Sequence, residues 1–378
     1  MKVVVPRERV AGETRVAVTP RTVKRLVRAG LSVHIETGAG SASGISDAEF
    51  IEAQATIVSD PHSLYTDAGI VLGVQPPDAE TIARIPAGTF LVATINPLIE
   101  HDLVNRLAEQ RVTSFSLDLV PRIARAQSMD VLSSMSTLAG YQAVLLAAMS
   151  LPGIVSYLTT AAGTLHPAKV LVLGAGVAGL QAIATARRLG ALVWGYDIRP
   201  VVAEQVESLG ATFLDLDVAA EDAEDAGGYA REQTQDQAQR QQAAMTAHLA
   251  EMDVVITTAL IPGRPAPELV TTEMVAAMKS GSVIVDLAAE RGGNCALTRP
   301  GTNYTTDSGV TILGPLNLCC TLPAHASLMY ANNVVNFLLH ICRDASIDVD
   351  TDDEVTIGTL VTHDGQVVHE RVRQVLEA

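Results

Sequence analysis

The sequence predicts an α/β protein of two domains, each built on a mostly parallel, doubly wound sheet. Short apolar runs alternate with segments of helical periodicity along both halves of the chain, as in sheets with helices on both faces. A chain of 378 residues exceeds one small core and indicates two domains of roughly 150–200 residues. Hydrophobic residues form 48% of the chain and aromatic residues only 3%, so small apolar side chains allow close packing of helix on sheet.

The first alternation builds an N-terminal domain. Its predicted strands cover residues 2–6, 32–36, 70–74, 90–94 and 113–116, and its predicted helices cover 22–29 and 46–53. The chain beyond residue 344 is charged at first and then shows strand-like alternation over 355–357 and 360–362. We expect this tail to pack back on the first domain, which would then comprise residues 1–133 and 323–378.

A second alternation covers residues 134–322. A continuous apolar strand over 168–173 precedes a glycine-rich loop and a helix over 180–189. Further strands are expected over 192–196, 254–258, 282–287 and 310–313, the last of these closing the sheet.

Residues 131–165 contain no charged side chain, and this stretch is long enough to span a bilayer. It also contains many serines and threonines, together with Gly140, Pro152 and Gly153, at positions where a spanning helix would favour Leu, Ile and Phe. A buried helix connecting the two domains is the better interpretation.

Charge and cysteine content exclude several classes of protein. A net charge of −16 without a basic stripe argues against a nucleic-acid partner. Cys295, Cys319, Cys320 and Cys342 form no CxxC array, so we expect reduced structural thiols and no metal site. His166, His325 and His340 likewise lack metal-ligand spacing and are interpreted as structural. The first six residues resemble a strand and not a secretory signal.

The glycine-rich loop is the motif that carries the chemistry. It follows a strand, opens a helix and precedes a second strand that ends in Asp197, which together form a Rossmann dinucleotide-binding unit. Its glycines would make the tight turn, let the pyrophosphate approach the backbone closely and allow the helix to pack closely on the strand. Asp197 would accept hydrogen bonds from the adenosine ribose and repel a 2′-phosphate, which favours NAD over NADP, although Arg199 lies nearby. The predicted loop residues are Gly174, Ala175, Gly176, Val177, Ala178 and Gly179.

Two further polar segments are candidates for the site. Arg122, Arg125, Gln127, Asp130 and Ser133 crowd together at the expected domain junction, and residues 290–294 follow the strand over 282–287. The acidic and glutamine-rich stretch over 213–242 is either a solvated loop and exposed helix or a mobile flap over the site.

Several of these motifs belong together. The glycine loop is accompanied by six further segments: PRIARAQSMD at 121–130, QAIATA at 181–186, EQVESLG at 204–210, GGYA at 227–230, TTALIPG at 257–263 and GGNC at 292–295. With them the sequence closely resembles, over nearly its whole length, the NAD(H)-binding component (domain I, a separate soluble α1 subunit) of proton-translocating nicotinamide nucleotide transhydrogenase.

The resemblance implies a site and a set of partners. Arg122, Gln127, Asp130 and Ser133 match the family segment that holds the nicotinamide end, and Tyr229 matches the mobile loop that closes over the cofactor. Ala259 and Leu260 match cofactor contacts in the TTALIPG segment. The resemblance further implies a cleft between two Rossmann-like domains joined by a long helix, and a homodimer. The partners would be a component that binds NADP(H) and a membrane-spanning component that carries protons. The enzyme would be a Re/Si-specific transhydrogenase that passes hydride from NADH to NADP⁺, with this chain cytoplasmic and held at the membrane through its partners.

The alternative is an alanine dehydrogenase, which resembles this fold and shares Arg15. Amino-acid oxidation needs a general acid/base, and the Lys and His of that family fall near Gly73 and Asn96, with Glu290 as the acid after the sheet strand. Neither Gly73 nor Asn96 supplies this chemistry, whereas direct hydride exchange between two nicotinamide rings needs no proton donor. Gly73 and residues 316–323 also depart from the usual transhydrogenase pattern.

A third interpretation is a protein that binds NAD as a sensor and catalyses no reaction of its own. The polar cluster at 122–133 argues against it.

Overall fold

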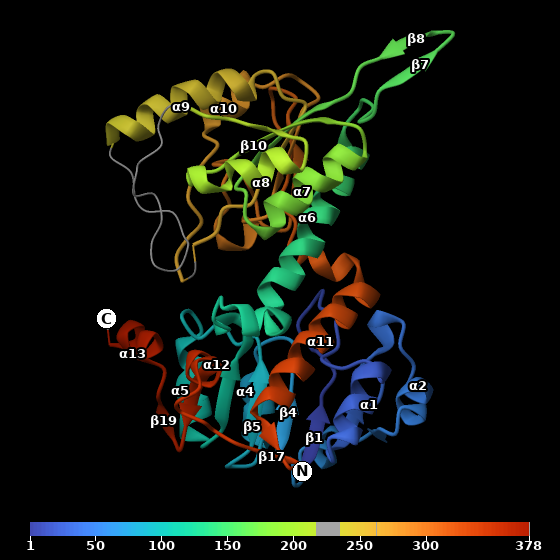
Figure 1. Cartoon of the computed structure of the whole chain (residues 1–378), viewed down its shortest axis with the longest axis vertical. Helices are drawn as coiled ribbons and strands as arrows, with labels where there is room; N and C mark the ends of the chain where they lie inside the picture. The colour runs from blue at the N-terminus through green and yellow to red at the C-terminus, as the bar shows by residue number, and fades with distance from the viewer. Residues whose placement is uncertain (217–234, 262, 378) are drawn as a thin grey trace. The chain divides into compact units, whose positions relative to one another are not determined.

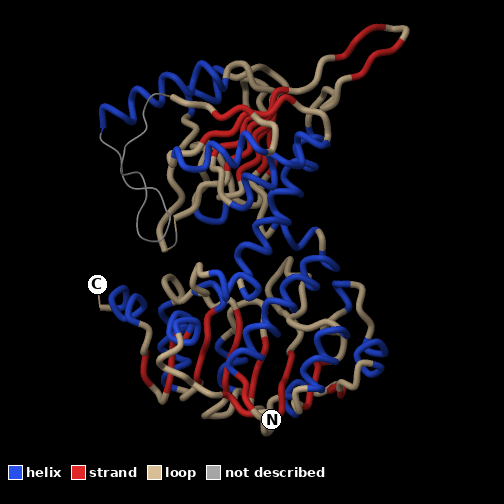
Figure 2. The backbone as a smooth tube through the Cα atoms, viewed as in Figure 1, coloured by secondary structure: helices blue, strands red, loops and turns tan. Residues whose placement is uncertain are grey.

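The computed structural model describes residues 1–216, 235–261 and 263–377 and divides into two compact units. Unit 1 comprises Met1–Met135 and Cys319–Ala378, and unit 2 comprises Ser136–Leu318. Each unit is built on a mostly parallel sheet with helices on both faces (Figures 1 and 2), which confirms the predicted fold class. The C-terminal segment belongs to unit 1, as expected, because β18 pairs with β6.

Unit 1 has the strand order β19-β18-β6-β5-β4-β1-β2-β3. Strands β1 to β6 pair in parallel, whereas β18 and β19 are antiparallel additions from the C-terminal segment. The chain leaves β1 toward β2 on one side and β4 on the other, so the order reverses at β1. The strands are β1 (Lys2–Val5), β2 (Ser32–Glu36), β3 (Thr56–Val58), β4 (Ile70–Leu72), β5 (Phe90–Ala93), β6 (Thr113–Ser116), β18 (Leu360–His363) and β19 (Gln366–Val367).

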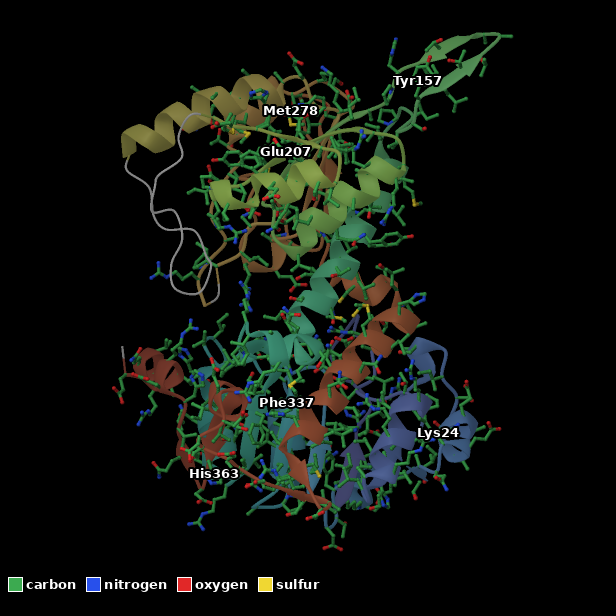
Figure 3. The ribbon with its side chains drawn as sticks, viewed as in Figure 1. Lys24, Tyr157, Glu207, Met278, Phe337 and His363 are labelled. Atoms are coloured by element: carbon green, nitrogen blue, oxygen red, sulfur yellow. The ribbon has the colours of Figure 1, made fainter. Side chains whose placement is uncertain are left out.

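Alternate residues of these strands face opposite cores, as the two-residue repeat of a strand requires. Val3 and Val5 pack in one core and Val4 in the other. The first core is covered by α1 (Pro20–Arg28), α2 (Asp47–Glu52), α11 (Pro323–Ile341) and α12 (Glu354–Thr359). The second is covered by α3 (Pro61–Leu64), α4 (Ala79–Arg84), α5 (His101–Glu109) and α13 (Glu370–Leu376). Helix α11 lies against the sheet through Phe337 (Figure 3), whose ring meets Phe115 of β6 edge-on at 5.5 Å between centroids.

Unit 2 has the strand order β11-β10-β9-β12-β13-β15-β14, and its order reverses at β9. Val170 and Val172 face the core under α6 (Val131–Ser150), α7 (Val177–Arg188) and α8 (Ala203–Ser208). Leu171 and Leu173 face the core under α9 (Gln235–Leu249) and α10 (Thr272–Ala277). The strands are β9 (Lys169–Leu173), β10 (Leu192–Tyr196), β11 (Thr212–Phe213), β12 (Val254–Thr257), β13 (Val283–Asp286), β14 (Asn303–Thr305) and β15 (Thr311–Leu313).

Three local expectations are wrong. Residues 355–357 are helical and not strand-like, because Asp353 caps α12 by accepting a hydrogen bond from the Thr356 amide at 2.8 Å. The helix expected from residue 180 begins at Val177, so Val177, Ala178 and Gly179 lie in its first turn. The strand expected to close the sheet of unit 2 is followed at the edge by β14, which pairs antiparallel to β15.

The uncharged stretch forms α6 and then a hairpin. Helix α6 has a length and composition compatible with crossing a membrane, yet only 28% of its most apolar segment is buried. The prediction of a helix is therefore correct, whereas the prediction that this helix is buried is wrong. The chain then forms β7 (Leu158–Thr160) and β8 (Gly163–Leu165), which project from the rest of unit 2 (Figure 2) and are exposed throughout. The remaining short elements are β16 (Cys342–Arg343), β17 (Ser346–Ile347) and the 3₁₀ turns Ser41–Ser43, Leu117–Leu119, Ala124–Met129, Pro200–Val202, Ala289–Arg291 and Leu318–Thr321.

Candidate dinucleotide-binding site

The glycine loop connects β9 directly to α7, and its three glycines have different surroundings. Gly174 has φ +96°, and a Cβ there would lie 2.6 Å from Oγ1 of Thr258. A Cβ on Gly179 would lie 1.8 Å from the Gly174 carbonyl oxygen. Gly176 has nothing within 4 Å of such a Cβ. Packing of the loop therefore requires glycine at 174 and 179, whereas at Gly176 the backbone borders open space.

Open space at Gly176 coincides with the amino end of α7. Gly176 is the N-cap residue of this helix, and no side chain caps its first amides. The amides of the first helical turn have no partner within the helix and attract anions. Val177, which opens the helix, has a 44% exposed side chain. A phosphate that approaches Gly176 would therefore meet free backbone donors and no obstructing side chain.

Asp197 lies beside the glycine loop, one residue beyond the end of β10. Its Oδ2 accepts a hydrogen bond from the Ala175 amide at 2.8 Å. The Arg199 guanidinium pairs with the same carboxylate, through Nε to Oδ1 at 2.9 Å and through the Nη2 group to Oδ2 at 3.1 Å. The structure thus brings Gly174–Gly179, Asp197 and Arg199 together at the carboxyl ends of β9 and β10. In doubly wound sheets this edge, where the strand order reverses, is the usual ligand-binding edge.

Ala259 follows β12, the other neighbour of β9. Its amide donates to Oδ1 of Asn294 at 2.9 Å, and its carbonyl accepts from Nδ2 of Asn294 at the same distance. Asn294 is fully buried and also donates to the Pro267 carbonyl at 2.8 Å. Leu260, the next residue, has a side chain that is 47% exposed. A buried asparagine therefore fixes the backbone of the segment that carries Ala259 and Leu260.

Sequence reasoning missed Asp286, the residue that organises this side of the site. Asp286 ends β13, is fully buried, and accepts hydrogen bonds from the Ala288 and Asn294 amides at 2.9 and 2.7 Å. It also accepts from the Cys295 amide and from the hydroxyls of Thr257 and Thr298. Burying a carboxylate is costly unless hydrogen bonds compensate it, and here five donors do. The signal in the sequence was an acid that ends a strand of otherwise apolar residues.

The segment predicted to hold the nicotinamide end lies in unit 1. Arg122 and Gln127 are exposed, and Gln127 lies in the 3₁₀ turn Ala124–Met129. Asp130 accepts hydrogen bonds from the Ser133 amide at 2.8 Å and the Ser133 hydroxyl at 2.5 Å. Asp130 and Ser133 are therefore joined as the cap of α6, a structural role that sequence reasoning did not assign to them.

The neighbouring turn is anchored from α11. Nδ2 of Asn333 and Nδ2 of Asn336 both donate to the Ser128 carbonyl at 2.9 Å. Nη2 of Arg25 in turn donates to Oδ1 of Asn336 at 2.8 Å. The backbone next to Gln127 is thus held by two side chains, while Gln127 itself faces outward. Tyr229, the residue predicted in the closing loop, and most of the stretch around it lie outside the described residues.

A second polar cluster lies in unit 1 where its strand order reverses, and sequence reasoning did not predict it. Glu13 is paired with Arg15 at 2.8 and 2.6 Å and accepts from Nε2 of Gln75 at 2.6 Å and from the Cys320 thiol at 3.0 Å. Burial acts to raise the pKa of Glu13, but the hydrogen bonds from Arg15, Gln75 and Cys320 lower it to about 2. Burial, with the nearby charge of Glu13, raises the pKa of Glu8 to about 7.

Of the residues that the rival interpretation would need, Gly73 and Asn96 lie in unit 1 and Glu290 lies in unit 2. Gly73 supplies no side chain, and its carbonyl accepts a hydrogen bond from the Tyr330 hydroxyl at 2.9 Å. Burial raises the pKa of that hydroxyl above its usual range. Asn96 has φ +48°, and its amide donates to Oδ1 of Asp118 at 3.4 Å. Glu290, assigned to unit 2, accepts a hydrogen bond from the Asn317 amide.

The four cysteines are reduced thiols, and Cys295, Cys319 and Cys320 are buried. His340, interpreted as structural, lies 3.0 Å from Asp353. Among residues 1–216, 235–261 and 263–377, no group of three or more His, Cys, Asp or Glu side chains could hold a metal ion.

Comparison with known proteins gives matches that cover both units. Residues 4–139 match the family model described as "Alanine dehydrogenase/PNT, N-terminal domain", and residues 143–370 match its C-terminal counterpart. The chain is 45% identical over 377 residues to the first part of the NAD(P) transhydrogenase alpha subunit of Rhodospirillum rubrum, and the match covers 98% of both chains. The crystal structure of a transhydrogenase from Sinorhizobium meliloti is 42% identical and superposes with a TM-score of 0.85, covering 98% of this chain and 99% of the other.

An L-alanine dehydrogenase structure superposes with a TM-score of 0.82 at 27% identity, covering 100% of this chain and 99% of the other. The fold is therefore common to both activities, whereas the higher identities are to transhydrogenases. The chain belongs to the alanine dehydrogenase/PNT family and, within it, is a transhydrogenase alpha-subunit homologue.

Proposed function

We propose that this chain is the NAD(H)-binding component of a proton-translocating transhydrogenase. It passes hydride from NADH to NADP⁺ held on a partner subunit, and a membrane-spanning partner couples the transfer to proton movement. The observation that carries the proposal is the open backbone at Gly176, at the uncapped amino end of α7 and beside Asp197. Together these features fit a dinucleotide, whose pyrophosphate needs close approach to backbone donors and whose ribose needs an acceptor.

The residues of unit 2 would bind the adenosine half. Amides of the first turn of α7 would donate to the pyrophosphate, and the Asp197 carboxylate would accept from the ribose hydroxyls. The Ala259–Leu260 segment, fixed by Asn294, would border the ligand on the side of β12. When bound, NADH supplies the hydride, and the protein contributes binding and orientation.

The nicotinamide end would be held by Arg122, Gln127, Asp130 and Ser133. Arg122 and Gln127 are exposed, so their side chains are accessible to a ligand, and the Asp130–Ser133 cap fixes the backbone between them and α6. Transfer between two nicotinamide rings requires their C4 atoms to approach to roughly 3–3.5 Å in good alignment. These residues would therefore orient a ring and need not move a proton.

Two features of unit 1 disfavour the alanine dehydrogenase alternative. Gly73 offers no side chain, and Arg15 already has a bidentate carboxylate partner in Glu13, itself held by Gln75. A substrate carboxylate would have to displace Glu13 to reach the Arg15 guanidinium. We therefore expect no formation of NADH from NAD⁺ with L-alanine. Steady alanine-dependent NADH production by the pure protein would favour the alternative.

A homodimer is part of the proposal, and the hairpin β7–β8 supports it. Every residue of both strands is exposed, and Tyr157 at the base of the hairpin (Figure 3) is 57% exposed. An isolated two-stranded hairpin is marginally stable in water, and exposed apolar patches mark interaction surfaces. We propose a cytoplasmic dimer held at the membrane through its partners. Leu158→Asp together with Leu165→Asp should yield a monomer by sedimentation; an unchanged dimer would argue against the hairpin as the contact.

Two variants test the proposed function. Gln127→Asn and Asp130→Asn should slow hydride transfer to NADP⁺ on an NADP(H)-binding transhydrogenase component by about ten- to hundredfold, because small misplacements of reacting atoms are costly. Their dissociation constants for NADH should rise by less than ~10-fold, or about 1.4 kcal/mol. The measurements are stopped-flow transfer and NADH titration. Asparagine at 130 retains a capping oxygen, so α6 should keep its amino end.

Gln374→Asn is a matched control, because Gln374 is an exposed glutamine on α13. It should transfer hydride at the rate of the unaltered protein. Unchanged transfer in both Gln127→Asn and Asp130→Asn, or a defect that disappears at saturating NADH, would contradict the roles proposed for these residues.

A further inference from the structure

Two asparagines of α11 hold the backbone of the turn that carries Gln127. Asn333 and Asn336 are three residues apart, so their side chains are neighbours on the helix surface. Nδ2 of each donates to the Ser128 carbonyl at 2.9 Å. The last carbonyls of a helical turn have no partner within that turn, and Ser128 is the last residue but one of the 3₁₀ turn Ala124–Met129. The two amides therefore hold the turn where its own hydrogen bonds end.

The surroundings of the two amides decide which end of each faces Ser128. Oδ1 of Asn336 accepts from Nη2 of Arg25 at 2.8 Å, and a guanidinium only donates, so the Nδ2 end of Asn336 is left to face the carbonyl. Asn333 is 6% exposed, and its Oδ1 has no hydrogen-bond partner in the part of the chain that the structure describes. A buried acceptor without a partner destabilises the fold, and an apolar side chain of similar size would fill this position without that penalty. Packing alone therefore does not explain an asparagine at 333.

The turn presents one side to the core and the other to solvent. Ala126 and Met129 are buried in the core that α11 covers, whereas Gln127 is exposed. Apolar contacts are non-directional, so the two buried side chains fix the depth of the turn more than its rotation. Hydrogen bonds depend on angle as well as distance, and those to Ser128 oppose such a rotation. Because Gln127 and Ser128 are consecutive, a rotation that moves the Ser128 carbonyl also redirects the Gln127 side chain.

We propose that Asn333 and Asn336 are positioning residues for hydride transfer, which set the direction of the Gln127 side chain through the Ser128 carbonyl. This inference rests on the proposed function, in which Gln127 orients the nicotinamide ring. The unpartnered Oδ1 of Asn333 is tolerated because its amide supplies a second donor at Ser128. Small misplacements of reacting groups slow a reaction strongly, so loss of both donors should affect transfer more than binding.

The test combines removal of the donors with removal of the side chain on which they are proposed to act. Asn333→Leu with Asn336→Leu, the double variant, is made in the unaltered protein and in Gln127→Ala. Leucine is close to asparagine in size and offers no donor. Each protein is measured by stopped-flow hydride transfer to NADP⁺ on an NADP(H)-binding transhydrogenase component at saturating NADH, by NADH titration and by thermal unfolding. Each single leucine variant keeps one donor and is measured in the same two backgrounds, so the test holds if the double variant is unstable.

The double variant should transfer hydride at least ~10-fold more slowly at saturating NADH, while its dissociation constant for NADH changes by less than ~3-fold. In Gln127→Ala the same two substitutions should slow transfer no further, because they act through the side chain that is missing. Asn333→Leu alone removes the unpartnered acceptor and leaves the Asn336 donor, so its melting temperature should not fall. Its transfer should be slowed less than that of the double variant.

Tyr330→Phe is a matched control on the same helix. It also removes a buried hydrogen bond to a backbone carbonyl of unit 1, that of Gly73, and should transfer hydride at the unaltered rate. Unaltered transfer in the double variant, or equal slowing with and without the Gln127 side chain, would overturn the inference and leave the proposed function intact. Unaltered transfer in Gln127→Ala would instead overturn the proposed role of Gln127.

Discussion

Gly176 and Gly179 provide a test that separates the fold of the glycine loop from its function. A Cβ on Gly179 would lie 1.8 Å from the Gly174 carbonyl oxygen, and real Cβ atoms essentially never approach closer than 3.0 Å. In Gly179→Ala the first turn of α7 must therefore move by at least the difference, 1.2 Å. Overpacking of this kind costs about 3 kcal/mol, which lowers the melting temperature of a domain of this size by about 6–12 °C.

Gly176→Ala should behave differently. Gly176 has φ −77° and ψ −167°, which alanine adopts readily, and nothing lies within 4 Å of the added methyl group. Its free energy of unfolding should therefore stay within about 0.5 kcal/mol of the unaltered value. The methyl group would nevertheless occupy the space that the pyrophosphate needs, so NADH affinity should fall by at least ~100-fold, or about 2.8 kcal/mol.

The assays are urea unfolding and NADH titration of both variants. Gly179→Ala should lose stability and binding together, whereas Gly176→Ala should lose binding alone. Gly153→Ala is a matched control, because its added methyl group also meets nothing within 4 Å and it lies outside the loop. Unchanged NADH affinity in Gly176→Ala would refute the reasoning that the pyrophosphate lies against this backbone.

Three further predictions concern stability. Burial raises the pKa of Glu8 from 4.5 to about 7, so the stability contributed by its neutral form is full below about pH 4.5 and is lost as pH rises through 7. Glu8→Gln should therefore be more stable than the unaltered protein at pH 8 and similar to it at pH 4.5. A pH-independent difference in melting temperature between the two proteins would contradict this. Asn294→Ala leaves the Ala259 amide and carbonyl without their buried partner, so it should lower the free energy of unfolding by about 2–4 kcal/mol and weaken NADH binding. An unchanged free energy of unfolding in urea would be inconsistent with this role of Asn294. Burial opposes the shift, but hydrogen bonds from His340, Thr356 and Arg125 hold the pKa of Asp353 well below its usual range, so the stability that its carboxylate contributes is full at pH 7 and declines as pH falls below about 3.8. Asp353→Asn should lower the melting temperature at pH 7 and by progressively less below pH 3.8, whereas the exposed Asp352→Asn should leave it unchanged at every pH; an equal loss for Asp353→Asn at all pH values would contradict this.

Local patterns in the sequence predicted much of the sheet and the loop between β9 and α7. The strands over residues 32–36, 113–116 and 192–196 have the expected bounds, because β-branched and apolar runs bounded by turn residues leave few alternatives. The roles of Gly174 and Gly179 also followed from local spacing, since a tight turn from strand to helix brings residues five apart into contact. Asp197, which the strand-loop-helix-strand pattern singled out as the ribose-binding residue, lies beside this loop, and its role toward a ribose stays a prediction.

The errors arose where the sequence signal was short or weak. The three residues at 355–357 are too few to separate a two-residue repeat from a helical one, and the cap at Asp353 decided for a helix. The exposed surface of α6 was missed because apolar composition indicates a helix without indicating what covers it.

Other features exist only because distant segments meet. Cys320 and Glu13 are 307 residues apart, and the return of the C-terminal segment to unit 1 brings the thiol to the carboxylate. Asn333 and Asn336 reach the Ser128 carbonyl for the same reason. The carboxylates of Asp197 and Asp286 could be placed at strand ends from the sequence, but their hydrogen-bond partners could not. Spacing along the chain determines which residues share a strand or a helical turn, whereas the partners of a buried charge are decided by whichever donors the tertiary fold brings within reach.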